Sequence, residues 1–232
     1  ACVDLAQLAH STVGITRYFD EAERSAQSDV VGIHGTAWFQ SPTVIVTAAH
    51  VASGMKLSTQ EWKSLKLEDG ADNQSISVRI RHLAGGLAEK LAVLELQTAV
   101  STARSVAIRT SPLVPEDRVV TIAYPNQRLR TVAGRFVQYA ENGRLAGTAL
   151  FEIFEGDNRL VIDHGASGTP VFDCEGRVAA VISTVITQIL ATPFGEMRLP
   201  TAWGSPNVVS VPIQQLMLRG AVRKSRAERS RI

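Results

Sequence analysis

Short apolar segments separated by turn-forming residues run through most of the chain. Val, Ile, Thr and aromatic side chains dominate each segment, and Gly, Pro, Asn, Asp or Ser stands at its ends, a pattern typical of β-strands. The pattern predicts strands at residues 11–18, 36–39, 43–47, 76–82, 91–96, 119–123, 131–139, 149–153, 159–162, 169–172, 177–185 and 208–211. Many short strands at such spacing indicate a sandwich or barrel, and therefore an all-β fold.

Helical periodicity is weak, except that residues 213–218 follow Pro212 and are expected to form a short C-terminal helix. The predicted strands fall into two clusters, at about residues 11–100 and 115–215, which a proline-containing, loop-like segment separates. A chain of 232 residues is long enough for one double-barrel domain. We therefore expect a single domain, residues 1–232, built from two halves and ending in a basic tail at residues 219–232.

The basic character of the chain is confined to that tail. The 24 Lys and Arg residues exceed the 22 Asp and Glu residues by two, but the tail holds six basic residues and one acidic residue. The remainder carries 18 basic against 21 acidic residues, a net charge of −3. A Lys/Arg-rich tail is more often a solvated segment than a nucleic-acid site. No apolar run of about 18 residues exists, so no membrane span is expected.

The two cysteines, Cys2 and Cys174, have no metal-like spacing. Cys174 lies in a turn-forming stretch, where burial of the thiol is disfavoured. We therefore hypothesise a disulfide between the two, and with it export to an oxidising compartment, periplasmic or secreted. The chain opens without a signal peptide, which would have been removed on export or is not part of this sequence.

A small-residue turn, residues 163–170 (DHGASGTP), places a single serine, Ser167, between glycines. Glycines allow a tight bend whose backbone N–H groups point inward, and such groups stabilise the oxyanion of an acyl-transfer reaction. Ser167 is thus a candidate nucleophile. By itself such a stretch more often forms only a turn.

A second segment, residues 47–51 (TAAHV), places His50 at the end of an apolar strand. A serine hydroxyl needs an adjacent base, and histidine is the usual one because its pKa lies near neutrality. Alone, His50 would be interpreted as an ordinary core or surface histidine. The presence of both segments favours a catalytic pair.

The ordered motifs resemble the trypsin-like serine proteases, and more narrowly the bacterial HtrA/Deg type, from about residue 11 to 217. The matching segments are residues 35–39 (GTAWF), 47–51, 165–173 (GASGTPVFD), 181–184 (VIST) and 207–212 (NVVSVP). The resemblance implies two six-stranded antiparallel barrels with the site between them. HtrA proteins commonly carry a PDZ domain after the protease domain, and the few residues after Leu218 are too few for one, so we expect a protease domain alone.

The resemblance further implies roles for individual residues. His50 would act as general base, and the N–H groups of Gly165 and Ser167 would form the oxyanion hole. A peptide substrate would pair with the strand edge at Ser183, Thr184 and Val185. Residues near Val161, Ile162 and Val185 would line the first substrate pocket, which we expect to take apolar or small side chains. His164, just before the nucleophile turn, is a further candidate for this lining, although a histidine at such a place is more often an exposed loop residue.

The chain departs from this family where the orienting aspartate is expected, because Lys90 precedes the strand 91–96. A lysine cannot accept the histidine N–H, and its charge disfavours the imidazolium. Three interpretations remain open: Glu89 reaches His50 through a local bulge, a carboxylate from the loop at residues 68–72 folds in, or the triad is broken. Register argues against the first, since a one-residue shift reverses the side chain.

The function that follows is a serine endopeptidase acting through a Ser167 acyl-enzyme, with the third triad member absent or displaced. The alternative is a catalytically impaired pseudoprotease that binds peptides or proteins, and a third, weaker interpretation is ester hydrolysis. No cofactor is expected, and His10, His34, His82 and His164 form no ligand-spaced cluster for a metal. The three scattered tryptophans give no base-stacking platform for nucleic acid. The oligomeric state is not visible in the sequence.

Overall fold

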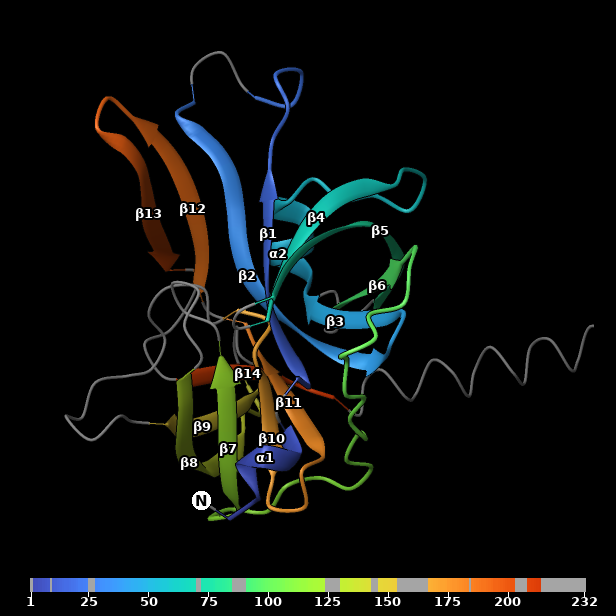
Figure 1. Ribbon diagram of the computed structural model, residues 1–232. Helices are drawn as coiled ribbons and strands as arrows, with labels where there is room; N and C mark the ends of the chain where they lie inside the picture. Colours follow the sequence, from blue (N-terminus) through green and yellow to red (C-terminus); the bar gives the residue numbers. More distant parts are fainter. Residues whose placement is uncertain are drawn as a thin grey trace, which may run out of the picture.

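The computed structural model describes residues 2–8, 10–24, 28–69, 72–84, 91–123, 130–142, 146–153, 167–183, 185–202 and 208–213. Strands dominate these residues, and two barrels lie one above the other in Figure 1. The first half of the chain contains α1 (Leu5–Leu8), β1 (Thr12–Tyr18), β2 (Val30–Ser41), β3 (Val44–Ala48), α2 (Ala49–Gly54), β4 (Lys63–Asp69), β5 (Asp72–Ala84) and β6 (Leu91–Leu96).

These six strands form the first barrel. Their order is β1-β4-β5-β6-β3-β2, and antiparallel pairing of β1 with β2 closes the ring among the described residues. Alternation places Leu65 and Leu67 of β4 in the interior, where they are fully buried with Ile15 and Ile45. The interior is therefore filled by apolar side chains rather than by a ligand cavity.

The second half of the chain forms the second barrel. It consists of β7 (Arg118–Ala123), β8 (Arg130–Tyr139), β9 (Ala149–Ile153), β10 (Pro170–Asp173), β11 (Val178–Ile182) and β14 (Val208–Pro212). They close in the order β10-β11-β14-β9-β8-β7 around Phe136 and Phe151. The two phenyl rings meet edge to face, with their centroids 5.4 Å apart. A third apolar cluster, including Trp38 of β2 and Phe172 of β10, packs one barrel against the other.

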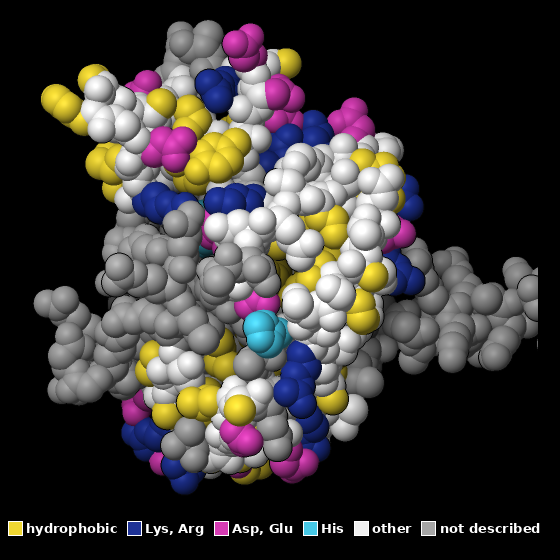
Figure 2. Space-filling model, viewed as in Figure 1, with side chains coloured by type: hydrophobic (Ala, Val, Ile, Leu, Met, Phe, Trp, Pro, Cys, Tyr) yellow, Lys and Arg dark blue, Asp and Glu magenta, His cyan; other side chains and the backbone are white. Residues whose placement is uncertain are grey.

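A long hairpin extends the first barrel. Its strands are β12 (Val185–Thr192) and β13 (Gly195–Ala202), and residues 187–190 of β12 also pair with β2. In Figure 1 the hairpin rises beside β2. Exposed apolar residues gather there, as Figure 2 shows at the upper left, and they are Tyr18, Phe194, Met197 and Leu199.

The N-terminal segment is tied to the second barrel by a disulfide. Cys2 is bonded to Cys174, which follows β10 directly, with a Cα–Cα distance of 5.0 Å. Cys174 is exposed in its turn, as the sequence pattern indicates.

The all-β double-barrel fold predicted from the sequence is confirmed. Several element boundaries differ from the prediction. β2 is longer than residues 36–39, the segment 177–185 is divided into β11 and β12 at Ser183, and β4, β13 and α2 were not predicted. The expected strand 159–162, the C-terminal helix beyond Ile213 and the basic tail lie outside the described residues.

Candidate active site

His50 is carried by α2, not by a strand end as the sequence suggested. Its neighbour Val51 is fully buried and packs against Gly35 of β2, where a Cβ atom would lie 2.7 Å from Val51 Cγ1. This close approach requires glycine and sets the position of α2 on the first barrel. His50 itself is half-buried.

Ser167 lies in the turn that precedes β10 and is buried. The next residue, Gly168, has a φ of +93°, and a Cβ atom there would overlap the Thr36 carbonyl oxygen. The Thr36 N–H donates to the Ser167 carbonyl oxygen at 3.0 Å, and the Thr47 hydroxyl donates to the Thr36 carbonyl oxygen at 2.7 Å. The first barrel thus holds the serine turn of the second barrel through main-chain contacts.

These two anchors bring His50 and Ser167 together across the barrel interface. The distance from His50 Nε2 to Ser167 Oγ is 2.9 Å. A base within about 2.6–3.2 Å of a hydroxyl is in range to take its proton. The pair is therefore placed for nucleophilic chemistry, although the residues are 117 positions apart in sequence.

The other imidazole nitrogen contacts a hydroxyl. Ser183 Oγ lies 3.3 Å from His50 Nδ1, on the side where a triad carboxylate would be expected. The sequence placed Ser183 in the substrate-binding strand and missed this contact. The only local signal is that Ser183 stands at the break between β11 and β12, and such a break has no distinctive sequence pattern.

Several candidate residues lie outside the described residues, namely Glu89, Lys90, Val161, Ile162, His164, Gly165 and Thr184. Their roles remain predictions. Val185 begins β12, where its main chain pairs with Ala202 of β13.

The acidic loop named as a second source of a carboxylate makes contacts with other histidines. Glu68 Oε2 lies 3.7 Å from His34 Nδ1, and Asp69 Oδ2 lies 2.6 Å from His10 Nδ1. Both contacts are on the first barrel and neither involves His50. The described part of the chain contains no group of three or more His, Cys, Asp or Glu residues arranged to hold a metal ion. No helix in that part is both long and apolar enough to cross a bilayer.

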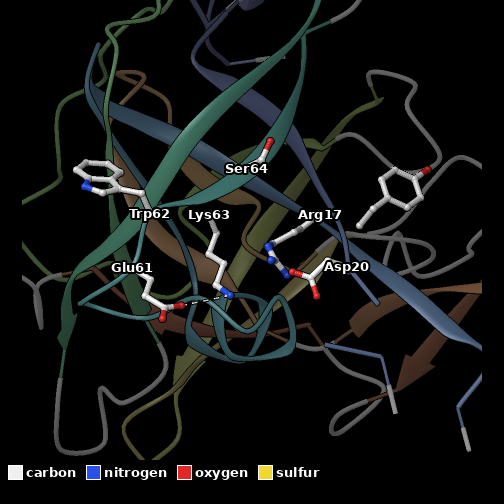
Figure 3. A pocket seen from close by; sticks show the side chains of 7 residues that line it. Arg17, Asp20, Glu61, Trp62, Lys63 and Ser64 are labelled. Atoms are coloured by element: carbon white, nitrogen blue, oxygen red, sulfur yellow. Dashed lines mark ion pairs between the residues drawn. The ribbon is translucent and has the colours of Figure 1, made fainter. Parts of the chain in front are cut away.

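A separate hollow of about 560 Å³ lies at the end of the first barrel (Figure 3). Its lining residues are Arg17, Tyr18, Asp20, Glu61, Trp62, Lys63 and Ser64. The cations pair with a neighbouring carboxylate, because Arg17 Nη2 and Lys63 Nζ lie 2.7 and 2.6 Å from Glu23 Oε1. Burial raises the pKa of Glu23, but hydrogen bonds from Arg17 and Lys63 outweigh it and lower that pKa to about 2. The charges of this hollow thus serve to fix the loop after β1.

Comparison with known proteins agrees with this fold. The family model described as a trypsin-like peptidase domain matches residues 35–181. No curated protein matches the chain in sequence.

Solved protease structures share the fold at low sequence identity. The active form of Rv3671c protease from M. tuberculosis is 15% identical, with a TM-score of 0.60 over 92% of this chain and 80% of that chain. The HtrA-type protease AlgW with decapeptide is 13% identical, with a TM-score of 0.62 over 95% of this chain and 66% of that chain. Deg5 is 15% identical, with a TM-score of 0.58 over 92% of this chain and 88% of that chain. The chain thus has the fold of HtrA-type proteases, and it belongs to the trypsin-like peptidase domain family.

Proposed function

We propose that the chain is a serine endopeptidase in which Ser167 is the nucleophile and His50 the general base. The 2.9 Å contact between His50 Nε2 and Ser167 Oγ carries this proposal. As Ser167 Oγ bonds to the substrate carbonyl carbon, its proton passes to Nε2. The same proton then goes to the leaving amine as the peptide C–N bond breaks, and water hydrolyses the acyl-enzyme by the reverse exchange.

The oxyanion formed in each step needs hydrogen-bond donors. We assign this role to the N–H groups of Gly165 and Ser167, because the small residues around Ser167 in the sequence favour a tight turn with its N–H groups on one side. The bend at Gly168, with its φ of +93°, supports such a turn.

The peptide is proposed to pair along the chain from Ser183 to Val185, beside His50. β12 pairs with β13 from Val185 onward, whereas its pairing with β2 begins only at Thr187. A peptide strand added at this edge therefore meets β2 after a short stretch. We therefore expect only a short peptide segment to be recognised on this side. Residues near Val161, Ile162 and Val185 would form the pocket for the first side chain, with His164 as a further candidate.

The third member of the triad determines how fast the enzyme turns over. Lys90 stands at the expected aspartate position in sequence, and the hydroxyl of Ser183 contacts His50 Nδ1. A lysine cannot accept the His50 N–H as a carboxylate does, and its charge disfavours the imidazolium. The lysine in the sequence at this position favours slow turnover, and it makes a peptide-binding pseudoprotease the second candidate.

Export is proposed as well. The disulfide between Cys2 and Cys174 supports a periplasmic or secreted location, since disulfides persist in oxidising compartments.

The test is digestion of an unbiased mixture of unfolded proteins, with new peptide ends identified by mass spectrometry. The matched control is Ser167→Ala, which removes one oxygen atom. We expect new ends with the wild type and none with the variant. Equal peptide binding by both proteins with cleavage by neither would establish the pseudoprotease, and cleavage by Ser167→Ala would refute the assigned nucleophile.

A further inference from the structure

The hairpin of β12 and β13 leaves one strand edge open. β13 stands last in the order of its sheet and, among the described residues, pairs with β12 alone. Figure 1 shows β13 on the outer side of the hairpin, away from β2. The side chains of Phe194, Met197 and Leu199 are exposed by 100, 48 and 44%. An edge strand with exposed apolar side chains is a template for pairing with another chain.

The main-chain groups that face this open edge follow from the pairing of β12. Ala191 N–H donates to the Asp29 carbonyl oxygen at 2.8 Å, beside the start of β2. Alternate residues of a strand direct their N–H and C=O groups to opposite sides, so Thr192 directs its groups to Gly195, its partner in β13. Counting along β13 in steps of two, its even-numbered residues therefore turn their main-chain groups to the open edge.

The usable part of this edge is short. Glu196 and Arg198 each carry both an N–H and a C=O group, whereas Pro200 has no N–H to donate. Pro200 thus ends the stretch of edge that starts at the hairpin turn. A partner strand can therefore pair with full hydrogen bonding at Glu196 and Arg198, and this restricts the possible registers.

Charge selects one register when this edge meets the same edge of a second copy. In an antiparallel arrangement about a two-fold axis through Met197, Glu196 lies opposite Arg198 of the second copy. Moving the axis by one residue would place two Glu196 or two Arg198 side chains opposite each other, and facing like charges are unfavourable. Arg198 can accept this partner, because its Nη1 has no hydrogen-bond partner in the part of the chain that the structure describes.

The apolar side chains fit the same register. Met197 lies on the axis and meets its own copy, and Leu199 lies opposite Gly195 of the second copy. A Cβ atom at Gly195 would find nothing within 4 Å, so the space beside it is open to the leucine. These odd-numbered residues share one face of the strand. The contact therefore buries apolar side chains on one face and pairs opposite charges on the other.

We propose that two copies of the chain associate through β13 as a two-fold dimer, in which the two hairpins form one continuous sheet. Glu196 and Arg198 exchange main-chain hydrogen bonds with each other across the axis. The pairing occupies the β13 edge of both copies, so the assembly closes at two. The interface goes beyond the proposed protease activity and does not depend on turnover.

Analytical ultracentrifugation of the wild type and two charge variants tests the pairing. Glu196→Lys leaves two cations on the edge and Arg198→Glu leaves two anions, so each variant alone should dimerise at least about tenfold more weakly. An equal mixture of the two should dimerise about as well as the wild type, because each edge then faces the opposite charge. Damage to the fold by either substitution would not be repaired by mixing.

Cysteine cross-linking tests the register. The two Met197 Cα atoms would lie about 4.5 Å apart across the axis, within reach of a disulfide. The two Leu199 Cα atoms would be separated by four residues, or roughly 13 Å. Met197→Cys should therefore give a cross-linked dimer under mild oxidation, whereas the matched control Leu199→Cys should not.

The outcomes decide the proposal. Recovery of the dimer on mixing, together with cross-linking at residue 197, would establish the interface. A wild type that stays monomeric up to about 1 mM would overturn it. An assembly whose affinity neither charge variant changes, or one that cross-links at residue 199 in place of 197, would overturn it as well.

Discussion

The contact between Gly35 and Val51 offers a sharp test of how the site is built. A Cβ atom at Gly35 would lie 2.7 Å from Val51 Cγ1 and 3.2 Å from Cγ2. Carbon atoms pack best at about 3.5–4.0 Å, so Gly35→Ala must push the Val51 side chain away by roughly 1 Å. Val51 is β-branched and buried, and it cannot escape by a simple rotamer change.

Both stability and activity should respond to this change. Overpacking of this kind costs about 1–3 kcal/mol of unfolding free energy. Because His50 adjoins Val51 on α2, displacement of the helix by about 1 Å should lower activity by roughly 100-fold. Urea unfolding measures the first effect, and peptide hydrolysis measures the second.

A compensating variant makes the reasoning refutable. Val51→Ala removes the two methyl groups that the new Cβ would strike, although alone it leaves a small cavity costing about 1–2 kcal/mol. The double variant should then lose less unfolding free energy than the two single variants lose together, by at least about 1 kcal/mol. Much of the activity should also return. Strictly additive losses would show that Gly35 does not set the position of α2.

Three further changes test other parts of the structure. Gly168→Ala should abolish activity and lower the unfolding free energy by about 1–3 kcal/mol, because residue 168 has a φ of +93° and the Thr36 carbonyl oxygen lies where the new Cβ would be. An active Gly168→Ala variant in the peptide hydrolysis assay would contradict this expectation. The Glu23 pKa of about 2 lies below the ordinary value of 4.5, so its stabilisation is present above about pH 4.5 and is lost as pH falls toward 2. Glu23→Gln should therefore lower the unfolding free energy by about 1–3 kcal/mol at pH 7, a loss that solvent screening partly reduces. The difference in unfolding free energy between wild type and variant, measured by urea unfolding, should shrink by pH 3, and a difference that stays constant would refute the ion-pair argument. Replacing Cys2 and Cys174 by serine opens a loop of 172 residues and should cost up to about 5 kcal/mol, seen as a lower unfolding midpoint that reductant no longer changes; an unchanged midpoint would exclude a stabilising disulfide.

Strands were predicted correctly where β-branched residues alternate, and they were missed where charged residues or short length obscured the pattern. β4 contains two lysines, a glutamate and an aspartate in seven residues, and only Leu65 and Leu67 reveal its buried face. β13 contains Pro200, and an edge strand such as β13 accepts proline because the residue lacks a backbone N–H and an edge strand has positions where no N–H is needed for pairing. α2 has six residues, too few to display a helical period.

The two motifs of the candidate site could be found in the sequence, but the distances and contacts between their side chains could not. Small residues around Ser167 and the apolar strand before His50 mark each half, whereas their separation depends on contacts such as Thr36 with Ser167. Ser183 could not be assigned to His50 from sequence, because its position follows from the hydrogen bonds of Ile182 with the serine turn. Single serines at strand breaks carry no pattern of their own.

Covalent labelling is the most direct test of the central claim that His50 activates Ser167. A fluorophosphonate reacts with an activated serine hydroxyl, and mass spectrometry of the digested adduct identifies the modified residue. We expect a single adduct on Ser167 in the wild type and its loss in a folded His50→Ala variant. An adduct that forms equally fast without His50, or no adduct on the folded wild type, would contradict the claim.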